Sequence, residues 1–198
     1  MEWQREISMF RSLFSGKKKR DASESSPADD TIRSARVGDV VVISGFSPTF
    51  EDAYFIIENI NRYGSAVGEW HELIGVDGDR RVGIEWSYDG EFFISVSEQD
   101  RPMGLTSIGL DDGDMERLDD EKSIDNHITF EGERYGYKNS YEAFLFKDDK
   151  GEGDGFWIWE FISDDLKKIV SVVKWGDMPF EVYTSAVISP DLVSVYKK

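Results

Sequence analysis

The sequence predicts a mostly β protein with two similar antiparallel meander lobes, folded as a roll, a sandwich or a partly open barrel. Two observations support this class. Short runs rich in β-branched and aromatic residues alternate with turn signals over most of the 198 residues. One such pattern, in residues 68–96, returns in weaker form in residues 155–185. A short amphipathic helix and a flexible linker are expected to precede the β-rich domain.

The first twenty residues combine an apolar helical face with a basic block. Bulky apolar side chains recur at helical spacing, and a glycine separates them from a run of cationic residues. This pattern is typical of a helix lying in an anionic membrane surface. Docking on the chain's own domain, docking on a partner protein and disorder are the alternatives. The membrane-binding candidates are Trp3, Ile7, Phe10, Leu13, Phe14, Lys17, Lys18, Lys19 and Arg20.

Two further segments have few strand-forming residues. Residues 21–35 are predicted to be a disordered linker, because residues 21–30 contain no apolar residue larger than alanine. Residues 99–125 are rich in acidic residues and are expected to form a loop between the lobes, with one helical turn at Asp114–Leu118 as the alternative. The β-rich domain then covers residues 36–198, with its repeated parts at about 36–98 and 126–198.

The strands follow from the apolar runs and the turns between them. In the first half, Asp77-Gly78 and Asp89-Gly90 are hairpin turn dipeptides, and the chain is expected to turn at residues 63–65. Strands are expected there at residues 40–43, 54–60, 70–74, 82–86 and 92–96. In the second half they are expected at residues 127–131, 135–137, 141–147, 156–162, 169–175, 179–187 and 192–196.

An internal duplication is the simplest explanation of the sequence similarity between the two halves. Placing Glu72 over Glu160 also aligns Val82 with Val170 and, after one inserted residue, Trp86 with Trp175. Only a handful of positions match, so chance similarity between two meanders is the alternative.

These motifs also resemble a known family. The G-x-W-x-E strand of residues 68–72, together with FEGERYGY, WIWEFI and VVKWGDMPFEVYTS in the second half, is similar to domain of unknown function family 4178 over approximately residues 37–196. The resemblance implies a bacterial protein, soluble or peripheral to the membrane, without an established activity. It also implies a genomic context of small membrane proteins and polyamine-synthase-like enzymes.

Composition excludes several classes of function. The chain has no cysteine, so it has no disulfide and no thiolate site, which fits a cytoplasmic protein. It has no apolar run long enough to span a bilayer, and no signal-peptide core is expected. The formal net charge is −17, and residues 37–198 carry 34 acidic but only 15 basic residues. Such a surface repels phosphate backbones, so nucleic acid is not an expected partner.

Candidate chemistry rests on a few polar residues in predicted strands. Side-chain alternation turns His71 away from Trp70 and Glu72, so these three residues cannot meet at one ligand. No zinc site is expected, because the other histidine, His127, has no second histidine at ligand spacing. Glu72 and Glu160 lie among apolar residues. Hydrogen bonding within the sheet is the simpler interpretation of both residues, and general acid–base catalysis in a cleft is the alternative. Glu85 is expected to be exposed.

Aromatic and acidic segments give two weaker indications. Trp157 and Trp159 share one strand face, where they belong to a core or, if exposed, to a patch that attracts cations. Residues 111–114 and 148–155 resemble calcium loops in composition but lack the oxygen spacing of such loops.

The sequence therefore favours a non-enzymatic interaction protein, held by its N-terminal helix at the inner membrane face or on a membrane-protein partner. A binding domain or an enzyme for a cationic, polyamine-like molecule is the alternative, with Glu72, Glu160, Trp70, Trp157 and Trp159 as ligand-binding candidates. An assembly subunit using its tryptophan face is a third hypothesis. No cofactor or metal is expected.

Overall fold

The computed structural model describes residues 32–46, 51–98 and 101–198, and it places their strands in a single antiparallel sheet of eleven strands. The order across the sheet is β11-β1-β2-β3-β4-β5-β10-β9-β8-β7-β6. The strands are β1 (Val40–Ile43), β2 (Ala53–Ser65), β3 (Gly68–Asp77), β4 (Arg80–Tyr88), β5 (Phe92–Ser97), β6 (His127–Phe130), β7 (Glu133–Phe146), β8 (Asp154–Ser163), β9 (Lys168–Lys174), β10 (Glu181–Ile188) and β11 (Val193–Tyr196). The mostly β prediction is therefore confirmed, and the described strands of both halves belong to one continuous sheet.

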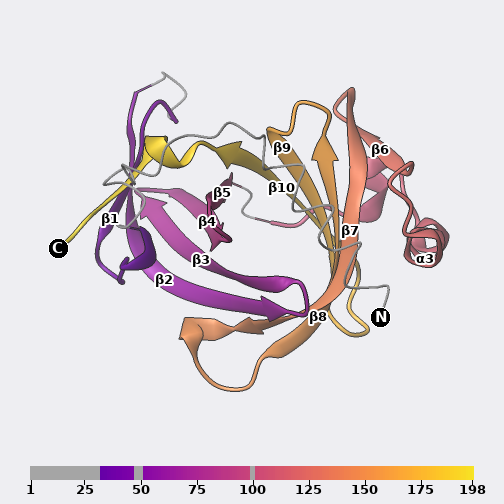
Figure 1. Cartoon of the computed structure of the whole chain (residues 1–198), viewed down its shortest axis with the longest axis horizontal. Helices are drawn as coiled ribbons and strands as arrows, with labels where there is room; N and C mark the ends of the chain where they lie inside the picture. Colours follow the sequence, from indigo (N-terminus) through magenta and orange to yellow (C-terminus); the bar gives the residue numbers. More distant parts are fainter. Residues whose placement is uncertain (1–31, 47–50, 99–100) are drawn as a thin grey trace.

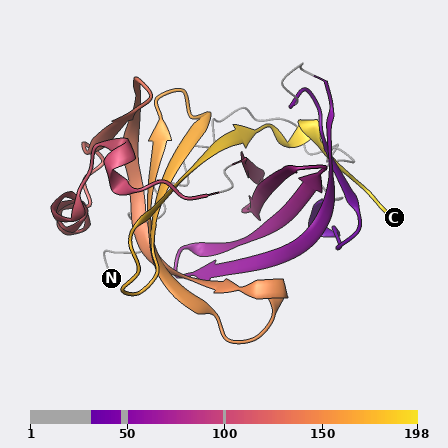
Figure 2. The ribbon, with the colours of Figure 1, turned by 180° about the vertical axis from the view of Figure 1, so that it is seen from behind.

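An additional pairing between β2 and β7 closes part of this sheet into a ring. The ring contains the eight strands β2, β3, β4, β5, β10, β9, β8 and β7, in that order. Figure 1 shows β2–β5 along one side of the ring and β7–β10 along the other. Seen from behind in Figure 2, the C-terminal strand returns to β1, with which β11 pairs outside the ring.

The two strands that close the ring are long and bulged. In β2 the register shifts between Ile57 and Asn59, and in β7 it shifts between Tyr137 and Asn139. A bulge bends a strand and increases its twist. Each strand therefore pairs first within its own half, β2 with β1 and β7 with β6, and then crosses to pair with the other.

These bulges explain two differences from the expected strands. Residues 63–65, expected to turn the chain, are the last residues of β2 and pair with β7. The interruption expected between residues 137 and 141 is the bulge inside a single 14-residue strand. Local glycine and polar residues suggested breaks, but pairing across the ring keeps both segments extended.

Hydrophobic side chains form three clusters on the two faces of the sheet. One cluster lies where β1 and β11 curl over β2–β5, and Ile32 is buried in it. A second lies between β6–β10 and the helical segment η1 (Leu105–Ile108) with α3 (Asp112–Glu121), seen at the outer edge of the second half in Figure 1. The third joins β7, β8 and β9 on the face that lines the ring.

The helix α3 corrects the expected loop at residues 99–125. Asp111 caps it, accepting a hydrogen bond from the Asp114 backbone N–H while the Asp114 side chain accepts one from the Asp111 backbone. Met115 and Leu118 face the second cluster and are 2% exposed. The acidic composition concealed a capping box and an apolar pair at helical spacing, which together are enough for a short docked helix.

The N-terminal helix and residues 21–31 of the linker lie outside the described residues, as do all of the membrane-binding candidates. Within the part of the chain that the structure describes, no helix is both long and apolar enough to cross a membrane.

Candidate functional site: the polar interior of the ring

Strand register brings polar side chains together inside the ring. Across the first half, Asn61 pairs with Glu72, Glu72 with Glu85, and Glu85 with Ser95. Directly paired residues share a face of a sheet, so this whole row points the same way. Across the second half the corresponding row is Asn139, Glu160, Ser171 and Tyr183. The ring interior is therefore lined by carboxylates, amides and hydroxyls at its middle level.

Each half anchors an interior glutamate through a tyrosine hydroxyl. Tyr63 Oη donates to Glu72 Oε2 at 3.0 Å, and Asn61 Nδ2 donates to the same oxygen at 2.8 Å. Tyr141 Oη donates to Glu160 Oε2 at 3.2 Å. These bonds fix one oxygen of each carboxylate against the wall.

Burial and two neighbouring carboxylates perturb Glu85. Desolvation is the larger cause, repulsion by Glu72 and by Glu160 adds to it, and together they raise the pKa of Glu85 from 4.5 to about 8. Ser95 Oγ lies 3.4 Å from Glu85 Oε2 and opposes the shift only weakly. Glu72 is the direct cross-strand partner of Glu85, and Glu160 reaches the same interior from the other half of the ring and adds to the rise in the pKa of Glu85.

Aromatic rings wall this region. Tyr63 stacks on Trp70 with ring centroids 5.0 Å apart, and Trp70 meets Tyr141 edge-on at 6.2 Å. Trp175 packs on Phe156 at 4.5 Å. Burial raises the pKa of Tyr63 and of Tyr141, and the adjacent glutamates raise it further, so both hydroxyls keep their protons as donors.

Two buried acceptors among the interior amides have no hydrogen-bond partner. They are Asn59 Oδ1 and Asn139 Oδ1, each on the residue immediately after a bulge and each in the row that faces the ring interior. Buried polar atoms are almost always paired, and an unpaired one costs about 1–3 kcal/mol. Among the described residues, two acceptors on the interior face of the ring therefore lack a donor.

Space beside Glu72 comes from a glycine. A Cβ added to Gly83 would lie 3.0 Å from Glu72 Oε1, the oxygen that neither Asn61 nor Tyr63 contacts. Because Gly83 has no side chain, it leaves room beside this second carboxylate oxygen of Glu72.

One cation points into the ring from the described residues of β7. Lys138 Nζ lies 3.4 Å from Glu160 Oε2 and 5.7 Å from the ring of Phe93. The side chains are 27% exposed for Lys138 and 15% for Glu160, so solvent reaches this part of the interior.

The sequence-predicted candidates divide between the two faces of the sheet. Glu72, Glu160 and Trp70 are brought together inside the ring. Trp157 and Trp159 share the outer face, where Trp159 is 6% exposed and packs on Phe180, while Trp157 is 39% exposed.

As expected, His71 faces away from Trp70 and Glu72, and it stacks on Trp86 at 4.5 Å. Glu85 was expected to be exposed, and this was wrong. Polar–apolar alternation does indicate two faces of β4, but here the polar face points inward.

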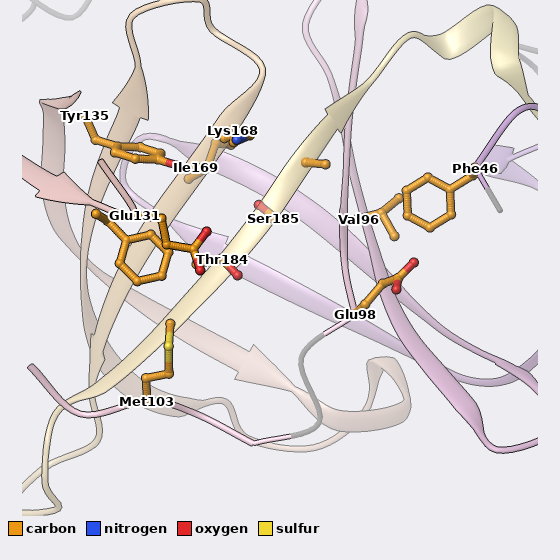
Figure 3. Close-up of a pocket in the computed structure, with 12 residues that line it drawn as sticks. Phe46, Val96, Glu98, Met103, Glu131, Tyr135, Lys168, Ile169, Thr184 and Ser185 are labelled. Carbon is orange, nitrogen blue, oxygen red and sulfur yellow. The ribbon is translucent and has the colours of Figure 1, made fainter. Parts of the chain in front are cut away.

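A separate pocket of about 530 Å³ lies on the outer side of the sheet, where β5 and β10 pair. Figure 3 shows β10 passing between Phe46 and Val96 on one side and Tyr135 and Lys168 on the other. Val96 belongs to the first hydrophobic cluster and Tyr135 to the second, so this pocket faces away from the glutamates.

Fold and interior together define the class: an antiparallel β protein whose sheet closes into a ring around an acidic, aromatic-walled interior. The chain belongs to the family described as Domain of unknown function (DUF4178), whose family model matches residues 45–190 and confirms the resemblance seen in the sequence. No curated protein and no solved structure matches the chain.

Proposed function

We propose that the protein binds a small organic cation, a primary amine in its ammonium form, inside the ring. The observation that supports this best is the convergence of Glu72, Glu85 and Glu160 from both halves on one partly solvent-accessible region. Glu72 and Glu85 lie directly opposite each other in the sheet, where two negative charges would repel, and this repulsion helps to keep Glu85 protonated near neutral pH. A bound cation would relieve that repulsion.

The surroundings suit an organic cation better than a metal ion. In the described residues, no group of three or more metal-ligating side chains is arranged to hold a metal ion. Aromatic walls attract organic cations through cation–π contact and exclude water from their alkyl parts. Unpaired amide oxygens accept hydrogen bonds, which an ammonium group donates. The interior of an eight-stranded ring is of a size that side chains can fill or that can hold one small ligand.

The charge of the whole chain favours the same ligand. A net charge of −17 raises the local concentration of cations and speeds their association. We propose binding as the primary role. If the amine is also converted, Glu85 is the residue whose pKa of about 8 suits proton transfer near neutral pH.

We also infer that the two halves derive from a duplication, with an alignment that differs from the one expected. The two bulges make Asn59 and Asn139 equivalent positions, so their cross-strand partners, Ile74 and Glu160, are equivalent as well. The partners of these two residues in the next strand, Gly83 and Ser171, form a third equivalent pair. Glu72 and Glu160 are then two residues out of register, because the turn between β8 and β9 is longer than the turn between β3 and β4.

The test is calorimetric titration of the full chain with butylammonium chloride, compared with tetramethylammonium chloride at equal ionic strength. We expect saturable binding of the primary ammonium and weaker binding of the quaternary ion, which donates no N–H. Glu72→Gln should weaken butylammonium binding by at least about tenfold, the equivalent of one charge-assisted hydrogen bond.

Glu142→Gln is the matched control, because Glu142 is an exposed residue of β7. It should bind like the wild type. Equal weakening by Glu72→Gln and Glu142→Gln would mean that the cation binds to the acidic surface, and the proposal would be abandoned.

For the N-terminal segment we propose attachment to an anionic membrane surface, supported by the amphipathic pattern and the basic block of residues 1–20. Flotation with anionic and neutral liposomes tests this. The full chain should float only with anionic vesicles, and a chain starting at Asp21 should not float. Flotation of neither form would exclude the tether.

A further inference from the structure

We infer that Lys138 is a built-in ammonium group that fills the Glu160 half of the interior, and that the Glu72 half therefore takes a single primary ammonium group from the ligand. This inference rests on the proposed function and specifies its ligand class. It makes Lys138 the residue that limits how many cationic groups the ligand can carry.

The contacts of Lys138 show how the interior holds an alkylammonium group. Its Nζ donates to Glu160 Oε2 at 3.4 Å, and the same carboxylate oxygen is anchored by Tyr141 Oη at 3.2 Å. The ammonium lies 5.7 Å from the centre of the Phe93 ring. A lysine side chain is a butylammonium group attached to the backbone, so the protein itself provides an example of the bound chemistry.

The corresponding position in the first half directs no cation inward. Glu58 is the bulge residue of β2 as Lys138 is of β7. It is an exposed carboxylate, and it accepts a hydrogen bond from Arg81 Nη1 at 2.9 Å. Among the residues that the structure describes, the hydrogen-bond donors to Glu72 are the neutral side chains of Asn61 and Tyr63, and Gly83 lies beside its other oxygen.

The asymmetry predicts a preference in ligand charge. With Glu160 occupied by Lys138, a second ammonium group on the ligand finds no free carboxylate at that end. An alkylammonium and an α,ω-diammonium alkane of equal length should therefore bind the wild type with similar affinity. Removing the lysine ammonium opens the second carboxylate, and the diammonium ligand gains a second contact.

The experiment compares the wild type, Lys138→Met and a Lys138→Met/Glu160→Gln double variant by calorimetric titration. The ligands are butylammonium and the α,ω-diammonium alkanes with three to six carbons. In the wild type the ratio of the best diammonium affinity to the butylammonium affinity should stay within about threefold. In Lys138→Met it should rise about tenfold, and in the double variant it should return to the wild-type ratio.

The control is Lys150→Met, because Lys150 is an exposed loop residue. It should leave the ratio unchanged, and thermal melts establish that every variant is folded. An unchanged ratio in Lys138→Met, with amine binding still dependent on Glu72, would overturn the role of Lys138 and leave the proposed function standing. Amine binding that does not depend on Glu72 would instead overturn the proposed function itself.

Discussion

Glu85→Gln should make the protein more stable at alkaline pH. The wild-type carboxyl has a pKa of about 8 in the folded chain against 4.5 as its usual value, because the fold favours its protonated form. Folding therefore binds this proton, and the stability linked to it is fully present below about pH 4.5. That stability is lost as the pH rises through about 8. Glutamine has the shape of the protonated acid and cannot ionise.

The magnitude follows from the shift. One pKa unit corresponds to 1.36 kcal/mol, so the shift sets an upper bound of about 5 kcal/mol on the stability lost between pH 4.5 and pH 8. Partial solvent access and relaxation lower this, and we expect Glu85→Gln to exceed the wild type by roughly 2–3 kcal/mol at pH 9. At pH 5 the two should agree within about 0.5 kcal/mol.

The assay is urea denaturation followed by tryptophan fluorescence at half-unit steps from pH 5 to pH 9. Glu142→Gln, at an exposed position on β7, is the control and should follow the wild type at every pH. If the difference between Glu85→Gln and the wild type does not grow with pH, Glu85 is not a half-buried carboxyl that repels Glu72 and Glu160, and the description of the interior is wrong.

Three further substitutions test the framework around the ring. Asp39→Asn should cost about 1.5–3 kcal/mol at pH 7 by urea denaturation, because the buried carboxylate accepts bonds from Lys197 Nζ, Lys198 N and Arg36 N. Burial raises the pKa of Asp39, but these bonds outweigh it and lower the pKa, so the cost should shrink as the pH falls below about 4. Gly75→Ala should cost about 1–3 kcal/mol, since the new Cβ would lie 2.8 Å from Phe55 Cβ, and an unchanged urea midpoint would contradict this packing. Phe161→Ala, at a side chain with 0% exposure, should cost about 3–5 kcal/mol, and a loss under 1 kcal/mol would mean that Phe161 is not a core residue.

Local sequence patterns predicted most strands and their turns. Asp77-Gly78 and Asp89-Gly90 end β3 and β4 as their dipeptide signals indicate. The closure of the ring was not predictable in the same way. The pairing of Tyr63 with Leu145 joins residues far apart in the chain, and no local pattern encodes a register between distant strands. The bulges that permit it look like strand ends when only the sequence is available.

The interior site was predicted in part. Glu72 and Glu160 were predictable as candidate site residues, because a glutamate among apolar residues needs a partner. The structure places both inside the ring. The position of Glu85 was not predictable from alternation alone, because alternation identifies the polar face of a strand but not the direction in which that face points. One sequence feature could have indicated a polar interior. An asparagine precedes a tyrosine in both halves, Asn59 four residues before Tyr63 and Asn139 two residues before Tyr141.

The most direct test of the central claim is the number of protons released when butylammonium binds. Calorimetric titration at pH 7 in two buffers of different ionisation enthalpy measures it. With a pKa of about 8, Glu85 is mostly protonated at pH 7, and a cation beside it lowers that pKa. The account predicts that the wild type releases up to about one proton per ligand bound and that Glu85→Gln releases essentially none. Equal proton release by the two proteins, or binding without proton release in the wild type, would contradict a cation site among these carboxylates.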